Sequence, residues 1–365
     1  MSKVESGRLH LQHLHIERLR LIESLTLDDL QQVNVFCGAN GSGKTSILEA
    51  IYLLATGRSF RTHLLKPMIA HQQKDLLVFA QGQHFRFGMQ RPLHADPILK
   101  LNGEVITQQS EFARLLPVQV IDPEGLSVLD SGSKPRRQLL DWLMFHVEPQ
   151  FHPQWLRYQR ALKQRNALLK MPRLDPIQLT AWEAELAAHG EQLHQMRSQV
   201  FAEWMPHLQE LCAQLLPDIA ISCQYHAGFD TSHPLIESLA ASRERDRERG
   251  HTSLGAHRAD LSFKTALGVA EDSLSRGQKK LLIVSLRLSQ LRLLRQQQRT
   301  TVVLLDDLTA ELDRAAQQRL LSLLLALDSQ IFLTTLSLEP ILTPLQQLAV
   351  QPKVVMLEQG RVHIV

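Results

Sequence analysis

The residues best suited to chemistry begin with a glycine-rich segment near the N-terminus. Residues 38–45 read Gly-Ala-Asn-Gly-Ser-Gly-Lys-Thr and match the phosphate-binding pattern G-x-x-x-x-G-K-T. Glycine lacks the Cβ that would block a close backbone approach, so successive N–H groups can surround a phosphate. Lys44 is expected to reach the β- and γ-phosphates of ATP, and the Thr45 hydroxyl to ligate Mg²⁺. The residues predicted to bind ATP are Gly38, Ala39, Asn40, Gly41, Ser42, Gly43, Lys44, Thr45 and Ser46.

A pair of carboxylates follows an apolar run in the last quarter of the chain. Residues 301–305 read TVVLL, typical of a buried parallel strand, and Asp306 and Asp307 come directly after them. Asp306 is placed to hold Mg²⁺ through water, and Asp307 can polarise an attacking water. Helix capping after a strand is the simpler alternative for this pair. Together with the glycine-rich loop, the pair predicts Lys44 and Asp307 as catalytic residues and Thr45 and Asp306 as Mg²⁺ ligands.

A third segment, Ser275-Arg276-Gly277-Gln278, precedes an apolar helical pattern over residues 279–294. A hydroxyl and glycine N–H groups at a helix N-terminus can bind an anion. The segment resembles the signature of ABC-type ATPases, which faces the γ-phosphate held by another subunit's loop. Residues 310–313, Ala-Glu-Leu-Asp, resemble the D-loop of the same class. The residues predicted to act in trans from a dimer partner are therefore Ser275, Arg276, Gly277, Gln278 and Asp313.

Strand patterns surround these segments in both terminal parts of the chain. A short β-type run at 33–37 and an apolar helix pattern at 46–54 flank the glycine-rich loop. The other predicted strands lie at 9–19, 25–27, 76–106, 117–121, 219–225, 260–263, 331–335, 353–357 and 361–365. Asn102-Gly103 is a strong hairpin signal, so residues 76–106 are predicted to form an antiparallel meander.

The middle of the chain is predominantly helical in pattern. Helical spacing of apolar residues covers 136–147, 154–170 and 177–216, and the last stretch is expected to break only at Pro206. The predicted fold class is α/β: a P-loop ABC-type ATPase head, with a mixed sheet and an antiparallel meander, carrying an inserted helical lobe. Residues 1–125 and 250–365 are assigned to the head and residues 126–249 to the lobe.

Composition limits the possible partners and location. The 365 residues carry a formal net charge of +3, so nucleic-acid binding has to depend on local basic clusters. The candidates for DNA contact are Arg58, Arg61, Lys134, Arg136 and Arg137, with ordinary solvated loops as the alternative. The three cysteines form no paired framework, and no secretory signal or membrane-length apolar run is visible. We therefore expect a cytoplasmic protein without a membrane partner.

With these segments in place, the whole chain resembles the RecF family of bacterial DNA repair ATPases, which are related to SMC and Rad50 heads. The resemblance is carried by the residues at 38–45, 58–61, 122–125, 134–141, 163–168, 255–260, 275–280 and 305–313. In the 255–260 segment, Ala256 stands where the family usually has Pro. The resemblance implies an ATP-dependent homodimer with weak DNA-dependent ATPase activity that binds single-stranded, double-stranded and gapped DNA. It also implies action with RecO and RecR to load RecA at single-strand gaps, in recombinational repair, the SOS response and replication.

Other P-loop proteins fit the sequence less well. Ser275 follows Lys44 by 231 positions, a wider interval than transporter ATPases have, and it contains a helical lobe. An SMC or Rad50 protein would carry hundreds of heptad residues there, and a small-molecule kinase would need no signature segment. Transporter ATPases usually have a switch His after the strand at 331–335, but this chain has Thr334-Thr335-Leu336-Ser337. Thr335 is the predicted γ-phosphate sensor.

Overall fold

The computed structural model describes residues 10–121, 127–307 and 314–364. The chain divides into two compact units, Met1–Gly125 with Leu294–Val365 and Leu126–Leu293. We expected the chain to return to the first unit at residue 250, but the division lies at 293/294. The reason is strand pairing, because β10 (Asp260–Thr265) pairs with β9 (Ser222–His226) and so keeps the segment after residue 250 in the second unit.

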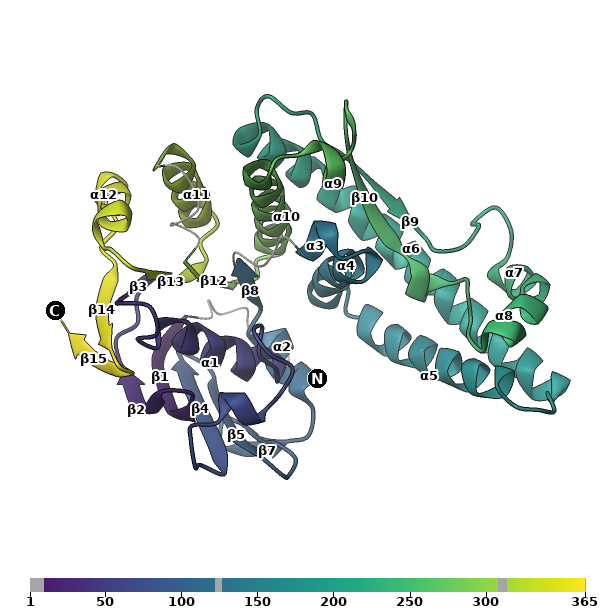
Figure 1. Ribbon diagram of the computed structural model, residues 1–365, viewed down its shortest axis with the longest axis horizontal. Helices are drawn as coiled ribbons and strands as arrows, with labels where there is room; N and C mark the ends of the chain where they lie inside the picture. The colour runs from purple at the N-terminus through teal and green to yellow at the C-terminus, as the bar shows by residue number, and fades with distance from the viewer. Residues whose placement is uncertain (1–9, 122–126, 308–313, 365) are drawn as a thin grey trace. The chain divides into compact units, whose positions relative to one another are not determined.

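The first unit contains a six-stranded mixed sheet whose order is β15-β14-β3-β13-β12-β8. The parallel strands are β3 (Val33–Cys37), β8 (Val118–Ile121), β12 (Val302–Leu305), β13 (Gln330–Thr335) and β14 (Lys353–Glu358), and β15 (Arg361–Ile364) is antiparallel to β14. All residues of β3, β12 and β13 are buried, as apolar strands of a covered parallel sheet must be. The predicted strands at 33–37, 117–121, 301–305 and 331–335 are therefore confirmed (Figure 1).

A second sheet in the same unit is antiparallel throughout, in the order β2-β1-β4-β5-β6-β7. Its strands are β1 (Leu11–Leu19), β2 (Ile22–Leu27), β4 (Asp75–Gly82), β5 (Arg86–Pro92), β6 (Ile98–Leu101) and β7 (Glu104–Ile106). Asn102 and Gly103 both have positive φ angles, 53° and 94°, and join β6 to β7 as the turn signal predicted. The meander is confirmed.

Helix α1 (Lys44–Thr56) packs against strands of both sheets. Most of its side chains are buried, and they form one core with apolar side chains of the two sheets. The buried Gln330 side chain adds a polar link between the sheets: its amide oxygen accepts from the Leu11 N–H at 2.8 Å, and its amide nitrogen donates to the Leu11 carbonyl at 2.7 Å. This unit also contains the helices α2 (Gln109–Leu115), α11 (Arg314–Ala326) and α12 (Glu339–Gln347). Packing on two sides holds α1, and the loop that precedes it, in one position.

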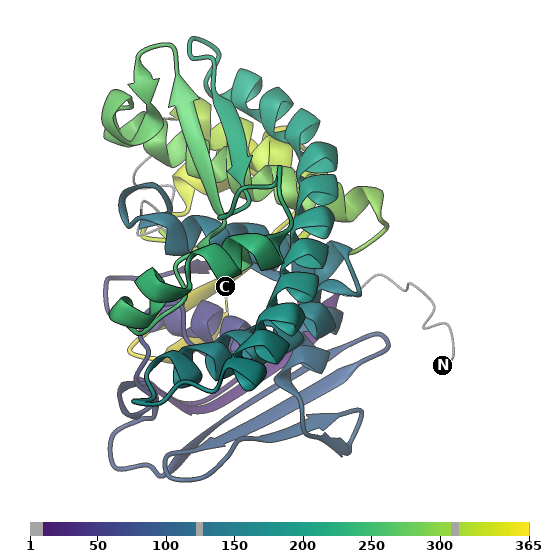
Figure 2. The same ribbon diagram turned by 90° about the vertical axis from the view of Figure 1, so that its right-hand side faces the viewer.

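The second unit is built around a helical hairpin of α5 (Phe151–Leu169) and α6 (Pro176–Leu215), which run side by side in Figures 1 and 2. The predicted break at Pro206 is wrong, because α6 continues through it with Trp204, Leu208 and Leu211 buried on either side. Packing along this face offsets the one backbone hydrogen bond that proline removes. The other elements are α3 (Ser127–Asp130), α4 (Ser133–Val147), α7 (Leu235–Ala241), α8 (Arg243–Arg249), β11 (Gly268–Val269), α9 (Ala270–Ser273) and α10 (Arg276–Gln296).

Buried charges join the free end of this hairpin to α8. Arg165 and Glu183 are both fully buried, and Arg165 Nη2 lies 3.1 Å from Glu183 Oε1. Arg165 Nη1 also lies 2.8 Å from Asp246 Oδ2, which is buried as well. Because each buried charge has an opposite partner, the network holds α8 in a specific place on the hairpin.

No described helix has both the length and the apolar character needed to cross a membrane.

Candidate nucleotide-binding site

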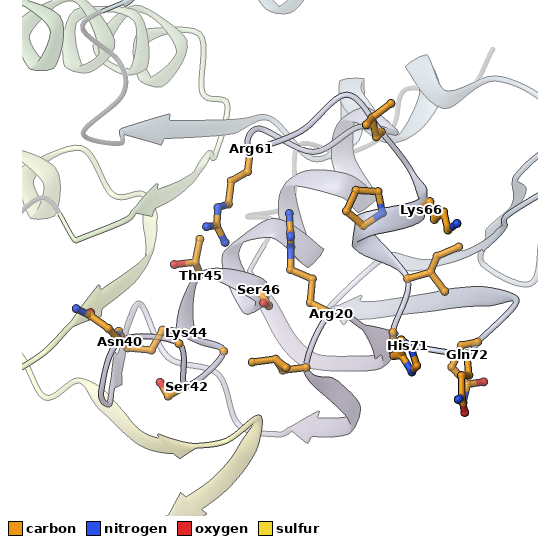
Figure 3. A pocket seen from close by; sticks show the side chains of 18 of the residues that line it. Arg20, Asn40, Ser42, Lys44, Thr45, Ser46, Arg61, Lys66, His71 and Gln72 are labelled. Carbon is orange, nitrogen blue, oxygen red and sulfur yellow. The ribbon is translucent and has the colours of Figure 1, made fainter.

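The glycine-rich loop joins the end of β3 to the start of α1, as the sequence predicted (Figure 3). Gly41 and Gly43 have φ angles of 78° and 103°, in the left-handed region that favours glycine. A Cβ on Gly38 would lie 2.4 Å from the Leu357 carbonyl oxygen and 2.7 Å from Ser42 Oγ, so any larger residue would clash with β14. The loop therefore needs glycine at these positions to point its backbone N–H groups inward at the N-terminus of α1.

Lys44 is 4% exposed, and its ammonium group lies across the loop. Nζ donates to the Gly38 carbonyl at 2.8 Å and to the Ala39 carbonyl at 3.0 Å. Ser42 Oγ is buried with no hydrogen-bond partner among the described residues. A buried polar atom without a partner costs free energy, so this hydroxyl marks a place where a polar ligand would be stabilised.

Two carboxylates close the other side of the loop at the end of β12. The Thr45 hydroxyl donates to Asp306 Oδ1 at 2.9 Å, although the two residues are far apart in sequence. The Thr334 hydroxyl, at the end of the neighbouring strand β13, donates to the same oxygen at 2.9 Å. Thr334 Oγ1 also accepts from the Asp307 N–H at 2.9 Å. Thr334 thus connects both carboxylate residues, whereas the predicted sensor Thr335 donates to the Ser337 carbonyl at 2.7 Å.

The oxygen atoms of Thr45 and Asp306 suit Mg²⁺, which prefers hard oxygen ligands. Burial raises the pKa of the Asp306 carboxyl, hydrogen bonds from Thr334 and Thr45 lower it in part, and the nearby Asp307 charge raises it further. A divalent cation would neutralise this half-buried acidic pair. Across residues 10–121, 127–307 and 314–364, no group of three or more His, Cys, Asp or Glu side chains could hold a metal alone. The site therefore fits the pattern in which Mg²⁺ takes one or two protein ligands together with substrate phosphates.

The loop opens into a cavity of about 1110 Å³ that lies within the first unit. Besides the loop residues and Asp307, the cavity is lined by Arg20, Arg61, Lys66, His71, Gln72 and others that the sequence did not indicate as nucleotide-site residues (Figure 3). Arg61 was predicted as a DNA contact, but its charge also acts on Asp306 and lowers the pKa of that carboxyl in part. Arg20, Arg61 and Lys66 form a cationic wall of this cavity, and such a wall suits a triphosphate.

Arg20 is held at this wall by a fully buried carboxylate. Its guanidinium donates to both oxygens of Glu49, through Nη2 to Oε1 at 2.7 Å and through Nε to Oε2. Ser59 Oγ also donates to Glu49. Glu49 lies in α1, and Ser59 lies in the segment 58–61. No local sequence pattern predicted that Glu49 would contact Arg20 and Ser59. The contacts fix the segment after α1 against the β1–β2 turn.

The predicted signature segment lies at the N-terminus of α10, in the second unit. The Ser275 N–H donates to Gln278 Oε1 at 2.9 Å, and the Gln278 N–H donates to Ser275 Oγ at 3.4 Å. This reciprocal pair is a capping box, which shapes the helix end and leaves Ser275, Arg276 and Gly277 exposed. The geometry is compatible with an anion site presented to another molecule. Asp313 lies outside the described residues.

The basic residues predicted to contact DNA have different surroundings. The Arg58 side chain is exposed and makes no hydrogen bond or ion pair within the described chain, and the same holds for Lys134.

Arg136, in contrast, lies 2.8 Å from Asp260 and 2.9 Å from Glu271, and its side chain is only 12% exposed. The hydrogen bond to Asp260 raises the pKa of the Arg136 guanidinium. Arg137 is half-buried and donates to the Ala259 carbonyl at 3.0 Å. Arg136 is therefore committed to carboxylates of its own unit.

These contacts predict that Arg136→Ala lowers stability more than DNA affinity. The change leaves Asp260 and Glu271 without their cation, and loss of one partner from a largely buried pair should lower the free energy of unfolding by about 2–3 kcal/mol. Urea unfolding of the full chain measures this, with Arg173→Ala, an exposed arginine of the same unit, as the control. An unchanged unfolding midpoint combined with weaker DNA binding would instead return Arg136 to the DNA surface.

Comparison with known proteins agrees with the fold. A sequence profile described as "RecF/RecN/SMC N terminal domain" matches residues 10–356. The chain is 49% identical to "DNA replication and repair protein RecF" of Acinetobacter baumannii (strain SDF), over 98% of this chain and 99% of the relative. The protein of the same description from Cellvibrio japonicus (strain Ueda107) is 39% identical, over 97% of this chain and 99% of that one.

Two solved structures extend the comparison. One, described as "Structure of the recombination mediator protein RecF-ATP in RecFOR pathway", has a TM-score of 0.86 with 21% identity and covers 100% of both chains. An Smc head domain from Pyrococcus furiosus has a TM-score of 0.59 with 14% identity, over 98% of this chain and 96% of that one. The fold and the loop thus define an ABC-type ATPase head. Within this class, the chain belongs to the RecF family.

Proposed function

We propose that this protein binds and slowly hydrolyses ATP and uses the nucleotide to control DNA binding in recombinational repair and replication maintenance. The observation that carries the proposal is the contact between Thr45 and Asp306, which brings the glycine-rich loop and the carboxylate pair into one site. Membership of the RecF family supports the DNA repair role. The relative of known structure is described with ATP, and we extend that ligand to this chain.

Each residue of the site has a distinct task in the proposed reaction. The loop N–H groups and Lys44 bind the β- and γ-phosphates, and the Thr45 and Asp306 oxygens hold Mg²⁺. When bound, Mg²⁺ neutralises charge that develops on the phosphate oxygens. Asp307 lines the cavity beside the loop, where its carboxylate can orient and polarise the water that attacks the γ-phosphate. Thr334 keeps both carboxylates in position through its hydrogen bonds.

We infer that the hydrolytic site is completed by a second copy of the chain. The exposed capping box at Ser275 and Gln278, in the same segment as Arg276 and Gly277, presents a helix N-terminus suited to the γ-phosphate of a partner subunit. Asp313 is proposed, from the sequence alone, to act on the same nucleotide. ATP would then join the two subunits, and hydrolysis would release them. The mass of the full-length protein in solution tests this: light scattering should show a dimer with ATP and Mg²⁺ and a monomer without nucleotide. A mass independent of ATP would contradict the proposed dimer.

We further propose that the ATP-bound dimer acts in the cytoplasm on gapped DNA, at junctions between single and double strands. It would promote RecA loading there together with RecO and RecR. Family membership supports this role, and exposed cations such as Arg58 and Lys134 are available for phosphate contacts. Binding of labelled gapped DNA with and without ATP tests the DNA part. Co-precipitation with purified RecR tests the partner part.

The signature assignment makes a separate prediction. Ser275→Arg places a bulky cation at the exposed end of α10, so ATP-driven dimerisation and hydrolysis should both fall below detection. ATP binding by the monomer should be unchanged, because Ser275 is predicted to contact only the partner's nucleotide. Equilibrium nucleotide binding and light scattering measure the two effects on the same sample.

Ser275→Ala is the matched control for this substitution. It removes the cap, at a cost of about 1 kcal/mol, without adding bulk, so dimerisation should largely survive. If Ser275→Arg loses monomer ATP binding while keeping the wild-type unfolding midpoint, then Ser275 acts on the nucleotide of its own chain.

A further inference from the structure

A second cavity, separate from the nucleotide loop, lies wholly within the second unit. It has a volume of about 380 Å³, within the range of about 300–1,000 Å³ typical of small-ligand pockets. Four cationic side chains and one carboxylate are among its lining residues: Lys134, Arg137, Arg197, Arg258 and Asp141. This excess of positive charge is notable in a protein whose net charge is only +3. The cavity therefore favours an anionic ligand.

Arg197 is the most buried of these four cations and is 1% exposed. Its Nη2 lies 2.7 Å from Asp141 Oδ1, and its Nη1 donates to the Ala256 carbonyl at 2.7 Å. Its Nε is buried with no hydrogen-bond partner among the described residues. Asp141 is the only carboxylate that lines the cavity in the described chain, and its charge acts on both Arg197 and Arg137, so the four cations of the lining still outnumber it.

The other three cations, Lys134, Arg137 and Arg258, form no direct ion pair within the described chain. The side chains of Lys134 and Arg258 are exposed and make no hydrogen bond or ion pair within the described chain. Arg137 is half-buried, and burial lowers the pKa of its guanidinium; the charges of Asp141 and Asp260 raise that pKa in part, and those of Arg197 and Arg258 lower it further. Like charges gathered in a partly enclosed space repel one another, so an anion bound among them would gain free energy from all three.

The lining of the cavity also includes aromatic and uncharged side chains. Trp155 and Tyr158 of α5 line it together with Leu162. His257 Nε2 contacts the Thr252 carbonyl at 3.1 Å, so that nitrogen carries the proton, and Nδ1 accepts from the Tyr158 hydroxyl at 2.7 Å. Burial lowers the pKa of His257 to about 4, so this ring is neutral near pH 7. Tyr158 is buried, but the partly exposed Trp155 offers an aromatic face on which a nucleic-acid base can stack.

We propose that this cavity is a second phosphate site, which holds one phosphate group of a nucleotide among Lys134, Arg137 and Arg258 with the neighbouring base against Trp155. The proposal rests on the proposed function, because we assign the nucleotide to DNA rather than to the free pool. It gives the second unit a direct role in holding DNA. The motif at 255–260, which the nucleotide site does not use, then supplies a wall of this cavity.

The test compares two double variants of the full-length protein that lose the same charge. Lys134→Ala with Arg258→Ala removes the exposed cations of the cavity, and Arg173→Ala with Arg249→Ala removes two exposed arginines of the same unit elsewhere. Affinity for gapped DNA is measured at several salt concentrations, with and without ATP. The cavity variant should bind at least tenfold more weakly than the control variant, since loss of a single charge-assisted hydrogen bond to phosphate already costs a factor of about ten. Its salt slope should fall by about 1, as expected for one lost phosphate contact.

Further binding measurements identify which molecule carries the phosphate. Inorganic phosphate and dAMP are titrated into the Lys44→Ala protein, whose nucleotide loop is disabled, with and without the cavity substitutions. Cavity-dependent binding of dAMP that matches the DNA affinity would support the phosphate site but assign it to free nucleotides. Trp155→Leu should weaken DNA binding without changing the salt slope. Wild-type affinity in that variant would overturn the stacking contact.

Two results would overturn the proposal as a whole. One is equal DNA affinity and equal phosphate binding in the cavity and control variants. The other is cavity-dependent binding of poly-glutamate without any effect on DNA, which would make the site a receptor for an acidic peptide. Failure of the proposed ATP control would look different, because wild-type DNA binding would then be independent of ATP while the contrast between the two double variants remained.

Discussion

Replacement of Lys44 by Ala is expected to reduce ATP affinity by at least a hundredfold and to abolish ATP-driven dimerisation. The ammonium group lies across the loop, 2.8 Å from the Gly38 carbonyl and 3.0 Å from the Ala39 carbonyl, at the place where the β- and γ-phosphates are proposed to bind. Charge-assisted hydrogen bonds to phosphate contribute about 1.5–3 kcal/mol each, so loss of two is worth about 3–6 kcal/mol, a factor of a hundred or more.

Nucleotide titration calorimetry and light scattering measure the two effects of Lys44→Ala. Lys66→Ala is a matched control, because Lys66 lines the same cavity and is exposed but lies outside the loop. The control should lose far less affinity. If Lys44→Ala still dimerised at wild-type ATP concentrations, the role assigned to Lys44 would be wrong. The unfolding midpoint of the variant without nucleotide shows whether the loop itself remains folded.

The second large effect is expected for Asp307→Asn, which should slow ATP hydrolysis by roughly a hundredfold or more while ATP binding persists. This magnitude is that of a lost general base or water-positioning carboxylate. Asp307 has a φ angle of 44°, in the left-handed region, where Asn is one of the few residues tolerated without strain. The backbone N–H bond to Thr334 should therefore survive, and the variant differs from the wild type chiefly in charge.

Because this variant still binds ATP, its dimer should persist long after the wild-type dimer has separated. Single-turnover hydrolysis and the lifetime of the dimer after dilution measure both consequences. Asp306→Asn is the comparison: loss of the carboxylate that receives the Thr45 hydroxyl should impair Mg²⁺-dependent ATP binding itself. Wild-type hydrolysis by Asp307→Asn would transfer the catalytic role to another carboxylate, and Glu124 and Asp313, both outside the described residues, are the next candidates.

Much of the nucleotide site could be predicted from the sequence because its geometry is local. A strand, a glycine-rich turn and a helix occur in consecutive residues, so residues 33–56 determine where Lys44 and Thr45 point. The carboxylate pair follows the same logic, since an apolar run ending in two acids places them at the carboxyl edge of a parallel sheet. Parallel strands bring these edges together, and this is why the contact between Thr45 and Asp306 agrees with a prediction made from two distant motifs.

Other features were decided only when distant segments packed. Thr334 and Thr335 are equivalent in a sequence pattern, but alternation along β13 directs Thr334 to the carboxylates and Thr335 to Ser337. Arg136 lies in a basic segment typical of DNA contacts, but in the folded chain its guanidinium pairs with Asp260 and Glu271. The unit boundary moved to 293/294 because β9 pairs with β10.

The sequence by itself therefore determined the loop, the helix after it, the carboxylate strand and the family. Those features depend on backbone preferences and apolar periodicity within a few consecutive residues. Only the tertiary structure decided which charges are neutralised. Arg20 meets buried Glu49, and Arg136 meets Asp260, while Lys134 and Arg258 remain unpaired beside a cavity. The physical reason is that an ion pair depends on the distance between side chains that are far apart in sequence, and a local sequence pattern does not predict that distance.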